Sequence, residues 1–190
     1  MWVLVGAAAL GAGVVPSASA AVARMRVGEI ARLPANARIA GTTPAATALA
    51  LTVMLQPRDP AALRAFATAV STPGSALYHH YLTVAQFAAR FGATRTRIRA
   101  VERALAAEGL TVGRPAANDL TLPVQGGAGR VEHALSVSLA QVRIGGRTAY
   151  ANQQAPALPS AIARYVQGVI GLDDLTPDQP AGLAGPGAGA

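Results

Sequence analysis

The sequence predicts an α+β fold, a ferredoxin-like split βαβ sandwich in which an antiparallel sheet packs on helices, with one helical insertion. Three observations predict it. Strand and helix patterns follow one another in the order β-α-(α-α)-β-β-α-β-β, turn residues separate them, and 190 residues give room for one domain with tails. Because 52% of the residues are hydrophobic and only 4% aromatic, the core should be aliphatic.

The absence of cysteine excludes several kinds of site, and the net charge favours one kind of partner. The sequence has no cysteine, which excludes a disulfide framework, a thiolate metal site and a cysteine nucleophile. The net charge is +7 and all 16 basic residues are arginine. This balance favours an acidic partner, whether a nucleic acid, an anionic membrane or an acidic protein surface. The alternative is that the arginines only keep an alanine-rich domain soluble.

Residues 1–20 have the pattern of a signal peptide. The apolar run over 2–15 is too short to cross a bilayer comfortably, and small residues allow cleavage after Ala20. No basic residue precedes the run, so a short buried helix stays open as the alternative. Residues 21–46 show no sustained period and are interrupted by Pro34, Gly41 and Pro44, which predicts an irregular leader.

The domain itself is expected to span 47–175 and to begin with a strand. Aliphatic residues alternate with smaller or more polar ones up to Pro57, the period of a half-buried strand. Asp59-Pro60 then supplies the N-cap and the first-turn proline of a helix. The aliphatic strand positions are Leu49, Leu51, Val53 and Leu55, and the apolar helix positions are Leu63, Phe66 and Val70.

Two further helices start at capping threonines. Thr83 with Gln86 three positions on forms a capping box, and Thr94 caps the third helix. Gly92 and Gly109 are placed to end the two helices. The apolar positions are Phe87 and Phe91 on the second helix and Ile98, Val101 and Leu105 on the third, whose opposite face carries Arg95, Arg99 and Arg103.

The second half is strand-rich. Glycines at 126–129 are expected to form a turn before a short helix that carries Val131, Ala134 and Leu135. A phosphate cradle is the alternative for these glycines, although the Lys-Ser/Thr ending of a P-loop is missing. The predicted strands are 110–112, 120–124, 139–144 and 149–151, and the Pro/Gly/Ala-rich stretch 176–190 is predicted to be a linker or tail.

The sequence offers little catalytic chemistry. His79, His80 and His133 have no metal-ligand spacing, and none of the serines lies in a Gly-x-Ser-x-Gly elbow. The arginine face of the third helix lacks the interleaved aromatics of a nucleic-acid site, so a solvated face is expected. We therefore expect no catalytic, cofactor-binding or metal-ligating residue in this chain.

The segment Ser71–Thr83, which reads STPGSALYHHYLT, resembles the signature of the pro-kumamolisin activation domain, the propeptide of the sedolisin family of serine-carboxyl peptidases. The resemblance covers about 48–174 and includes Leu158-Pro159 and the closing GVIGLD at 168–173. The residues of the family motif, which are candidates for an interface, are Pro73, Gly74, Tyr78, His79, His80, Tyr81, Leu82, Phe87, Phe91, Gly92 and Gly171.

This resemblance implies a ferredoxin-like propeptide of a secreted peptidase, an intramolecular chaperone and inhibitor that is removed on acid activation. The implied partner is a sedolisin-type peptidase domain, in cis or in trans, with no nucleic acid and no stable membrane insertion after signal cleavage. The family's Ser-Glu-Asp catalytic residues and calcium site have no counterpart here, so calcium would belong to a peptidase domain beyond Ala190. Leu135 departs from the aromatic that many relatives carry.

Physically, Pro73 and Gly74 fix a turn, beneath which Tyr78, Tyr81 and Leu82 are expected to bury their apolar parts. This corner is either purely structural or a contact with the peptidase. The adjacent histidines 79 and 80 form a hypothetical pH switch, because imidazole changes charge between about pH 5 and 8. The rival function is a stand-alone basic exported binding module for an anionic surface or nucleic acid, whose binding salt would weaken steeply.

Overall fold

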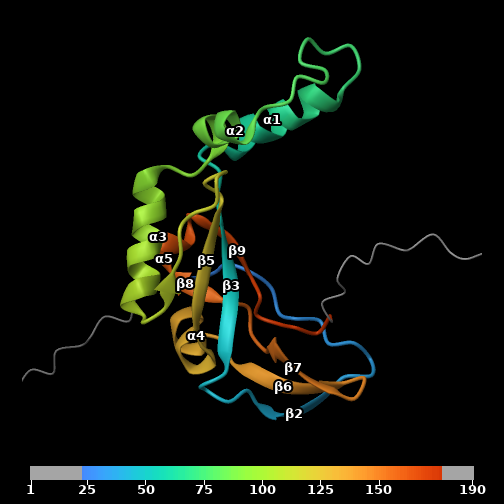
Figure 1. The fold of residues 1–190 in the computed structure, drawn as a ribbon, viewed down its shortest axis with the longest axis vertical. Coiled ribbons are helices and arrows are strands. Elements are labelled where there is room, and N and C mark those ends of the chain that lie inside the picture. Colours follow the sequence, from blue (N-terminus) through green and yellow to red (C-terminus); the bar gives the residue numbers. More distant parts are fainter. Residues whose placement is uncertain (1–22, 177–190) are drawn as a thin grey trace, which may run out of the picture.

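The computed structural model describes residues 23–176. The predicted signal peptide and, except for Thr176, the predicted tail lie outside the described residues. The centre of the fold is a four-stranded antiparallel sheet formed by β3 (Ala48–Leu55), β4 (Thr111–Val112), β5 (Thr121–Gly127) and β9 (Val166–Ile170). Its spatial order is β4-β5-β3-β9 (Figure 1), which places the first strand between the third and the fourth, as in a split βαβ sandwich. The predicted fold class is confirmed.

Three helices cover one face of this sheet: α3 (Arg95–Ala107), α4 (Ala128–Leu135) and α5 (Ser160–Ala163). The alternation predicted for the first strand appears as a strict pattern in which every second side chain of β3 is buried. The helix side chains meet this buried row and form an aliphatic core. Its members include Leu49, Leu51, Val53, Leu55, Ile98, Val101, Leu105, Leu122, Val124, Val131 and Leu135.

The fourth strand of the sheet was misidentified from the sequence. The stretches 139–144 and 149–151 do form strands, β6 (Leu139–Ile144) and β7 (Arg147–Asn152), but they belong to a separate three-stranded sheet. The fourth strand is β9, whose register to β3 shifts between Met54 and Leu55. Because Gln167 and Gly168 break the alternation at this shift, the period of two that marks a strand is missing.

The segment 21–46 was predicted to be irregular, but part of it forms strands. It contains β1 (Arg24–Arg26), which pairs with β8 (Ala157–Pro159), and β2 (Arg38–Thr42), which pairs with β6. All residues of β1 and β2 are exposed, so no buried row marks them in the sequence. Their pairing partners lie about 100 residues away or more, which a local pattern does not reveal.

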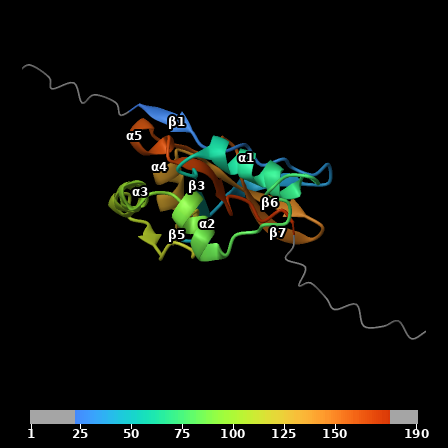
Figure 2. The same ribbon diagram turned by 90° about the horizontal axis from the view of Figure 1, so that it is seen from above.

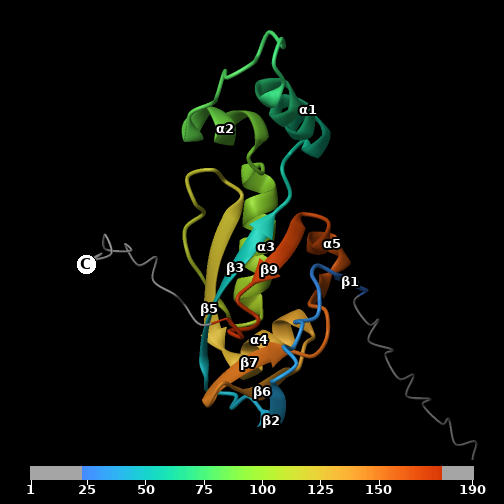
Figure 3. The same ribbon diagram turned by 90° about the vertical axis from the view of Figure 1, so that its right-hand side faces the viewer.

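Two helices, α1 (Pro60–Ser71) and α2 (Val84–Phe91), project from one end of the four-stranded sheet, and the three-stranded sheet lies at the other end (Figures 1 and 3). Seen from above, this pair, which we call the helical arm, lies over the end of the sheet (Figure 2). The predicted caps are confirmed: Asp59 accepts from the Ala62 N–H at 2.9 Å, and Thr94 caps α3. The capping box of Thr83 and Gln86 is present in both directions.

Removing the capping box should loosen the arm without unfolding the sandwich. Thr83→Ala deletes the acceptor of the Gln86 N–H and is expected to cost about 1 kcal/mol. Amide hydrogen exchange should then become faster in α2, while α3 keeps its protection. Thr94→Ala is the matched control, because it should speed exchange in α3 and not in α2. If amide exchange in α2 is equally fast in the wild type and in Thr83→Ala, the capping box does not stabilise α2.

The last described segment, Gly171–Leu175, is held along β7. Tyr150 N–H donates to Asp174 Oδ1 at 2.5 Å, and the Arg147 guanidinium donates to the Asp174 carbonyl oxygen at 2.7 Å. Leu175 is buried in the small core of the three-stranded sheet. Burial, and then the carboxylates of Asp174 and Asp173, raise the pKa of the Tyr150 hydroxyl, which donates to the Gly171 carbonyl oxygen at 3.2 Å. The chain therefore reaches Thr176 from a defined position.

Candidate partner interface

The candidate residues of the family motif fall into three places. Seven of them, Pro73 to Leu82, lie in the loop that joins α1 to α2 at the far end of the arm (Figure 1). Phe87, Phe91 and Gly92 lie on or directly after α2. Gly171 follows β9 in the four-stranded sheet. The structure thus brings the first two groups onto one arm and leaves Gly171 apart from them.

The tip loop presents its aromatic rings to solvent, so the predicted burial beneath the turn is wrong. Tyr81 is 71% exposed and Tyr78 is 37% exposed, while Leu82 is half-buried. The His79 ring stacks on the Tyr78 ring with 3.8 Å between centroids, and its φ of 61° is left-handed. The arm extends beyond the end of the sheet (Figure 1), and Val70 is the only buried residue of α1. The turn at Gly74, with φ of 84°, is as expected.

A small aromatic cluster holds the base of the arm together. The Phe91 ring lies 5.5 Å from the Phe66 ring and 5.6 Å from the Phe87 ring, and Phe91 is 1% exposed. The Arg90 guanidinium lies over the Phe66 and Phe91 rings. These residues are therefore structural parts of the arm.

Gly92 ends α2 as predicted, but the reason is space and not a left-handed backbone. Its φ is −55°, whereas a Cβ at this position would lie 2.6 Å from the Ala88 carbonyl oxygen and 3.0 Å from the Asn118 carbonyl oxygen. The Gly92 carbonyl oxygen in turn accepts from Arg58 Nε at 2.9 Å. Gly92 is thus the point at which the arm is packed onto the sandwich.

The sheet face opposite α3, α4 and α5 carries no charged side chain and has no helix on it within residues 23–176. We call this surface the open face. Small, polar and aliphatic residues form it, and Ile170 is 58% exposed. A shallow hollow of about 390 Å³ lies at its β4 side. The residues of the open face are Ala48, Ala50, Thr52, Met54, Thr111, Thr121, Pro123, Gln125, Gly168 and Ile170.

Sequence reasoning missed the open face, although a signal for it exists. In β3, the residues that alternate with the buried row contain no charged side chain; they are Ala48, Ala50, Thr52 and Met54. A sheet face that water solvates permanently usually carries charged residues, so an uncharged exposed row indicates an interface. The register with β5 and β9 makes this row a surface, because it sets Pro123 and Ile170 on either side of Thr52.

The glycines at 126–129 are neither a turn nor a phosphate site. Gly126 and Gly127 end β5, and α4 begins directly at Ala128. The first N–H groups of α4 are already used, since Ala128 donates to the Thr47 carbonyl oxygen and Gly129 donates to the Ala45 carbonyl oxygen. The loop at 45–47 lies so close that a Cβ on Gly127 would be 2.9 Å from the Ala45 carbonyl oxygen.

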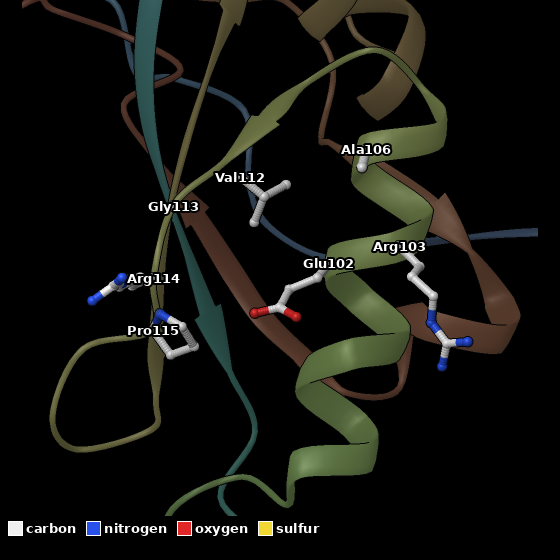
Figure 4. Close-up of a pocket in the computed structure, with 7 residues that line it drawn as sticks. All are labelled: Glu102, Arg103, Ala106, Val112, Gly113, Arg114 and Pro115. Atoms are coloured by element: carbon white, nitrogen blue, oxygen red, sulfur yellow. The ribbon is translucent and has the colours of Figure 1, made fainter.

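The remaining surface offers charge but no reaction chemistry. A hollow of about 500 Å³ lies between α3 and the segment after β4, and the Glu102 carboxylate extends into it (Figure 4). No second acid, histidine or serine lines that hollow. Within residues 23–176 there is no group of three or more histidines and carboxylates that could hold a metal ion. Arg95, Arg99 and Arg103 are exposed, as predicted for a solvated helix face.

Comparisons with known proteins match this chain to one family. The model of the family described as "Pro-kumamolisin, activation domain" matches residues 35–175, a range that includes β2. Xanthomonalisin from Xanthomonas sp. (strain T-22) is 35% identical over 124 residues, which are 65% of this chain and 15% of that protein. Sedolisin from Pseudomonas sp. (strain 101) is 31% identical over 130 residues, which are 68% of this chain and 22% of that protein. The chain therefore corresponds to a small part of the length of either relative.

Proposed function

The chain belongs to the family of pro-kumamolisin activation domains, and on this premise we propose that it is the propeptide of a secreted sedolisin-type serine-carboxyl peptidase. It acts by binding: it assists the folding of the peptidase domain, in cis or in trans, and inhibits it until activation, under acid conditions, removes the propeptide. The chain supplies no catalytic group of its own, and a calcium ion would belong to the peptidase domain.

The open face is the observation that supports a protein partner best. It combines exposed aliphatic residues with the absence of charge, and a flat sheet face can pack against helices of a partner as it packs against its own helices on the other side. A nucleic acid would instead need arginines on such a surface. We propose that the peptidase domain docks on the open face.

The C-terminal segment supports a role in which the tail enters the substrate cleft. Because Gly171–Leu175 is hydrogen-bonded along β7, the chain after Thr176 starts from a fixed point. Residues 176–190 are rich in proline, glycine and alanine, a composition that suits an extended segment that a peptidase can bind and cut.

Export is part of the proposal. The pattern of residues 1–20 favours a signal peptide cleaved after Ala20, followed by secretion. In the part of the chain that the structure describes, no helix is long and apolar enough to cross a bilayer.

Adding the purified domain to a mature sedolisin-type peptidase tests the function. We expect inhibition that weakens as the pH falls and that depends little on salt, since an uncharged face carries the contact. A basic module for nucleic acid or anionic lipid would instead lose its binding steeply with ionic strength. Full peptidase activity at every pH in the presence of the domain would contradict the proposal.

The paired histidines give a pH-dependence prediction of their own. His79 and His80 are exposed on the tip loop, and histidine is the side chain that pH-sensing proteins commonly use to change charge. If the tip contacts the peptidase, His79→Gln/His80→Gln should shift the midpoint pH of release. His133→Gln, which changes an exposed histidine on α4, is the matched control. An identical release profile for the double variant would leave the histidines without a role in the switch.

A further inference from the structure

Three arginines from separate parts of the chain gather around one hollow of about 360 Å³. Arg58 follows β3, Arg97 lies in the first turn of α3, and Arg164 follows α5. Its lining is completed by Tyr165, Gln56 and two prolines, Pro57 and Pro60. We call this hollow the arginine pocket; no feature of the proposed propeptide function accounts for it.

Tyr165 organises the arginine pocket. Its N–H donates to the Ile162 carbonyl oxygen at 2.9 Å, and its carbonyl oxygen accepts from the Gln56 N–H at 2.8 Å, so the residue is fixed between α5 and the end of β3. The guanidinium carbon of Arg164 lies 4.8 Å from the centre of the Tyr165 ring, and that of Arg97 lies 5.6 Å from it. Contact with the ring occupies a guanidinium face and leaves its N–H edges available.

The arginines of the pocket form no ion pair in the part of the chain that the structure describes. Within residues 23–176, no arginine side chain lies within 4.0 Å of a carboxylate, and the one ion pair joins His133 to Glu108. In the same range neither Arg97 nor Arg164 donates a side-chain hydrogen bond, while Arg58 uses Nε on the Gly92 carbonyl oxygen. Gathering like charges costs free energy, which a bound anion relieves.

The lining indicates which anion fits. Two prolines line the hollow with the arginines, and the Tyr165 ring lies beside two of the guanidinium groups, so the hollow is part apolar and part cationic. A carboxylate at the end of an aliphatic side chain matches both parts, because its methylene groups can contact the rings while its two oxygens accept from guanidinium N–H groups. A free phosphate ion has no apolar part and gains nothing from the rings.

We propose that the arginine pocket is a binding site for a glutamate or aspartate side chain of an acidic peptide segment. The pocket is built from α3, α5 and the end of β3, on the helix-covered side of the sheet, and so is separate from the open face. Its occupation does not depend on the proposed propeptide function, and the two are tested by different measurements.

The test is an NMR titration of the whole chain that follows the Nε–Hε signals of its arginines. The probe is an N-acetylated, C-amidated peptide containing two glutamates, and the control peptide carries glutamines in their place. We expect saturable shifts at Arg97 and Arg164 with the glutamate peptide only. Arg97→Gln and, separately, Arg164→Gln should each weaken binding about tenfold, and Arg99→Gln, an exposed arginine on the same helix, should leave it unchanged.

Four results would overturn the proposal. Three of them are equal binding of the glutamine peptide, uniform shifts at all arginines, and unchanged affinity in both pocket variants. The fourth is binding of inorganic phosphate to the pocket at the same concentration as the glutamate peptide. The last would show a general oxyanion site and not a carboxylate site. Circular dichroism of each variant verifies its fold, and two independent pocket variants ensure that a result is obtained even if one is unstable.

Discussion

Thr52→Glu is expected to weaken inhibition of a sedolisin-type peptidase about 100-fold, or ~2.7 kcal/mol. Thr52 lies at the middle of the open face, opposite Pro123 on β5 and Ile170 on β9. If the peptidase domain docks there, the glutamate would be buried without a counter-charge, which costs several kcal/mol before the interface adjusts. The measurement is the inhibition constant of the purified domain with the mature peptidase.

Thr148→Glu is the matched control for this result. Thr148 is an exposed threonine on β7, outside the open face, so the same change of charge should alter inhibition by less than about threefold. Both variants should unfold at nearly the same denaturant concentration as the wild type, since neither side chain is in the core. Inhibition by Thr52→Glu at wild-type strength would exclude the open face as the docking surface.

Gly171→Ala should reduce the free energy of unfolding by about 3 kcal/mol, the largest effect that we expect from adding a single methyl group. Gly171 has a φ of 92°, and a Cβ there would lie 2.6 Å from the Ala50 carbonyl oxygen. The added methyl group would clash with the backbone of β3, and no side-chain rotation can relieve a clash between a Cβ and a backbone oxygen. The segment after β9 would therefore have to move away from β3. Urea unfolding measures the change.

Gly146→Ala separates the two contributions to this cost. Gly146 has a similar φ of 80°, but no atom lies within 4 Å of where its Cβ would be. Its replacement should therefore cost only the backbone strain of a left-handed alanine, about 1 kcal/mol. If the two variants lose equal stability, the close contact at Gly171 does not limit packing.

Local sequence patterns determined the parts of this protein that depend on neighbouring residues. The cap at Asp59 and the capping box at Thr83 were predicted from side chains that satisfy N–H groups a few residues away. The buried row of β3 followed from its period of two, and the motif at 71–83 identified the family that the comparisons confirm. The alternation of strand and helix patterns was enough for the fold class, although it assigned the wrong segment as the fourth strand of the sheet.

The predictions from the sequence were wrong where the environment of a residue depends on residues far away in the chain. The tyrosines of the tip loop are exposed because the arm extends beyond the sheet, and nothing in their local pattern records that position. The strand β9 has an irregular register, so its assignment depends on pairing with β3 more than 100 residues earlier. The same holds for β2, which needs β6 to become a strand.

The candidate sites show this division most clearly. The sequence alone determined that the chain is basic, carries no recognisable catalytic motif and belongs with propeptides. Only the tertiary structure decided that ten uncharged residues of four strands form one open face, and that Arg58, Arg97 and Arg164 line one hollow with Tyr165. Both are juxtapositions of residues far apart in the chain, and such contacts are set by the pairing of strands and the packing of helices, which no short-range period encodes.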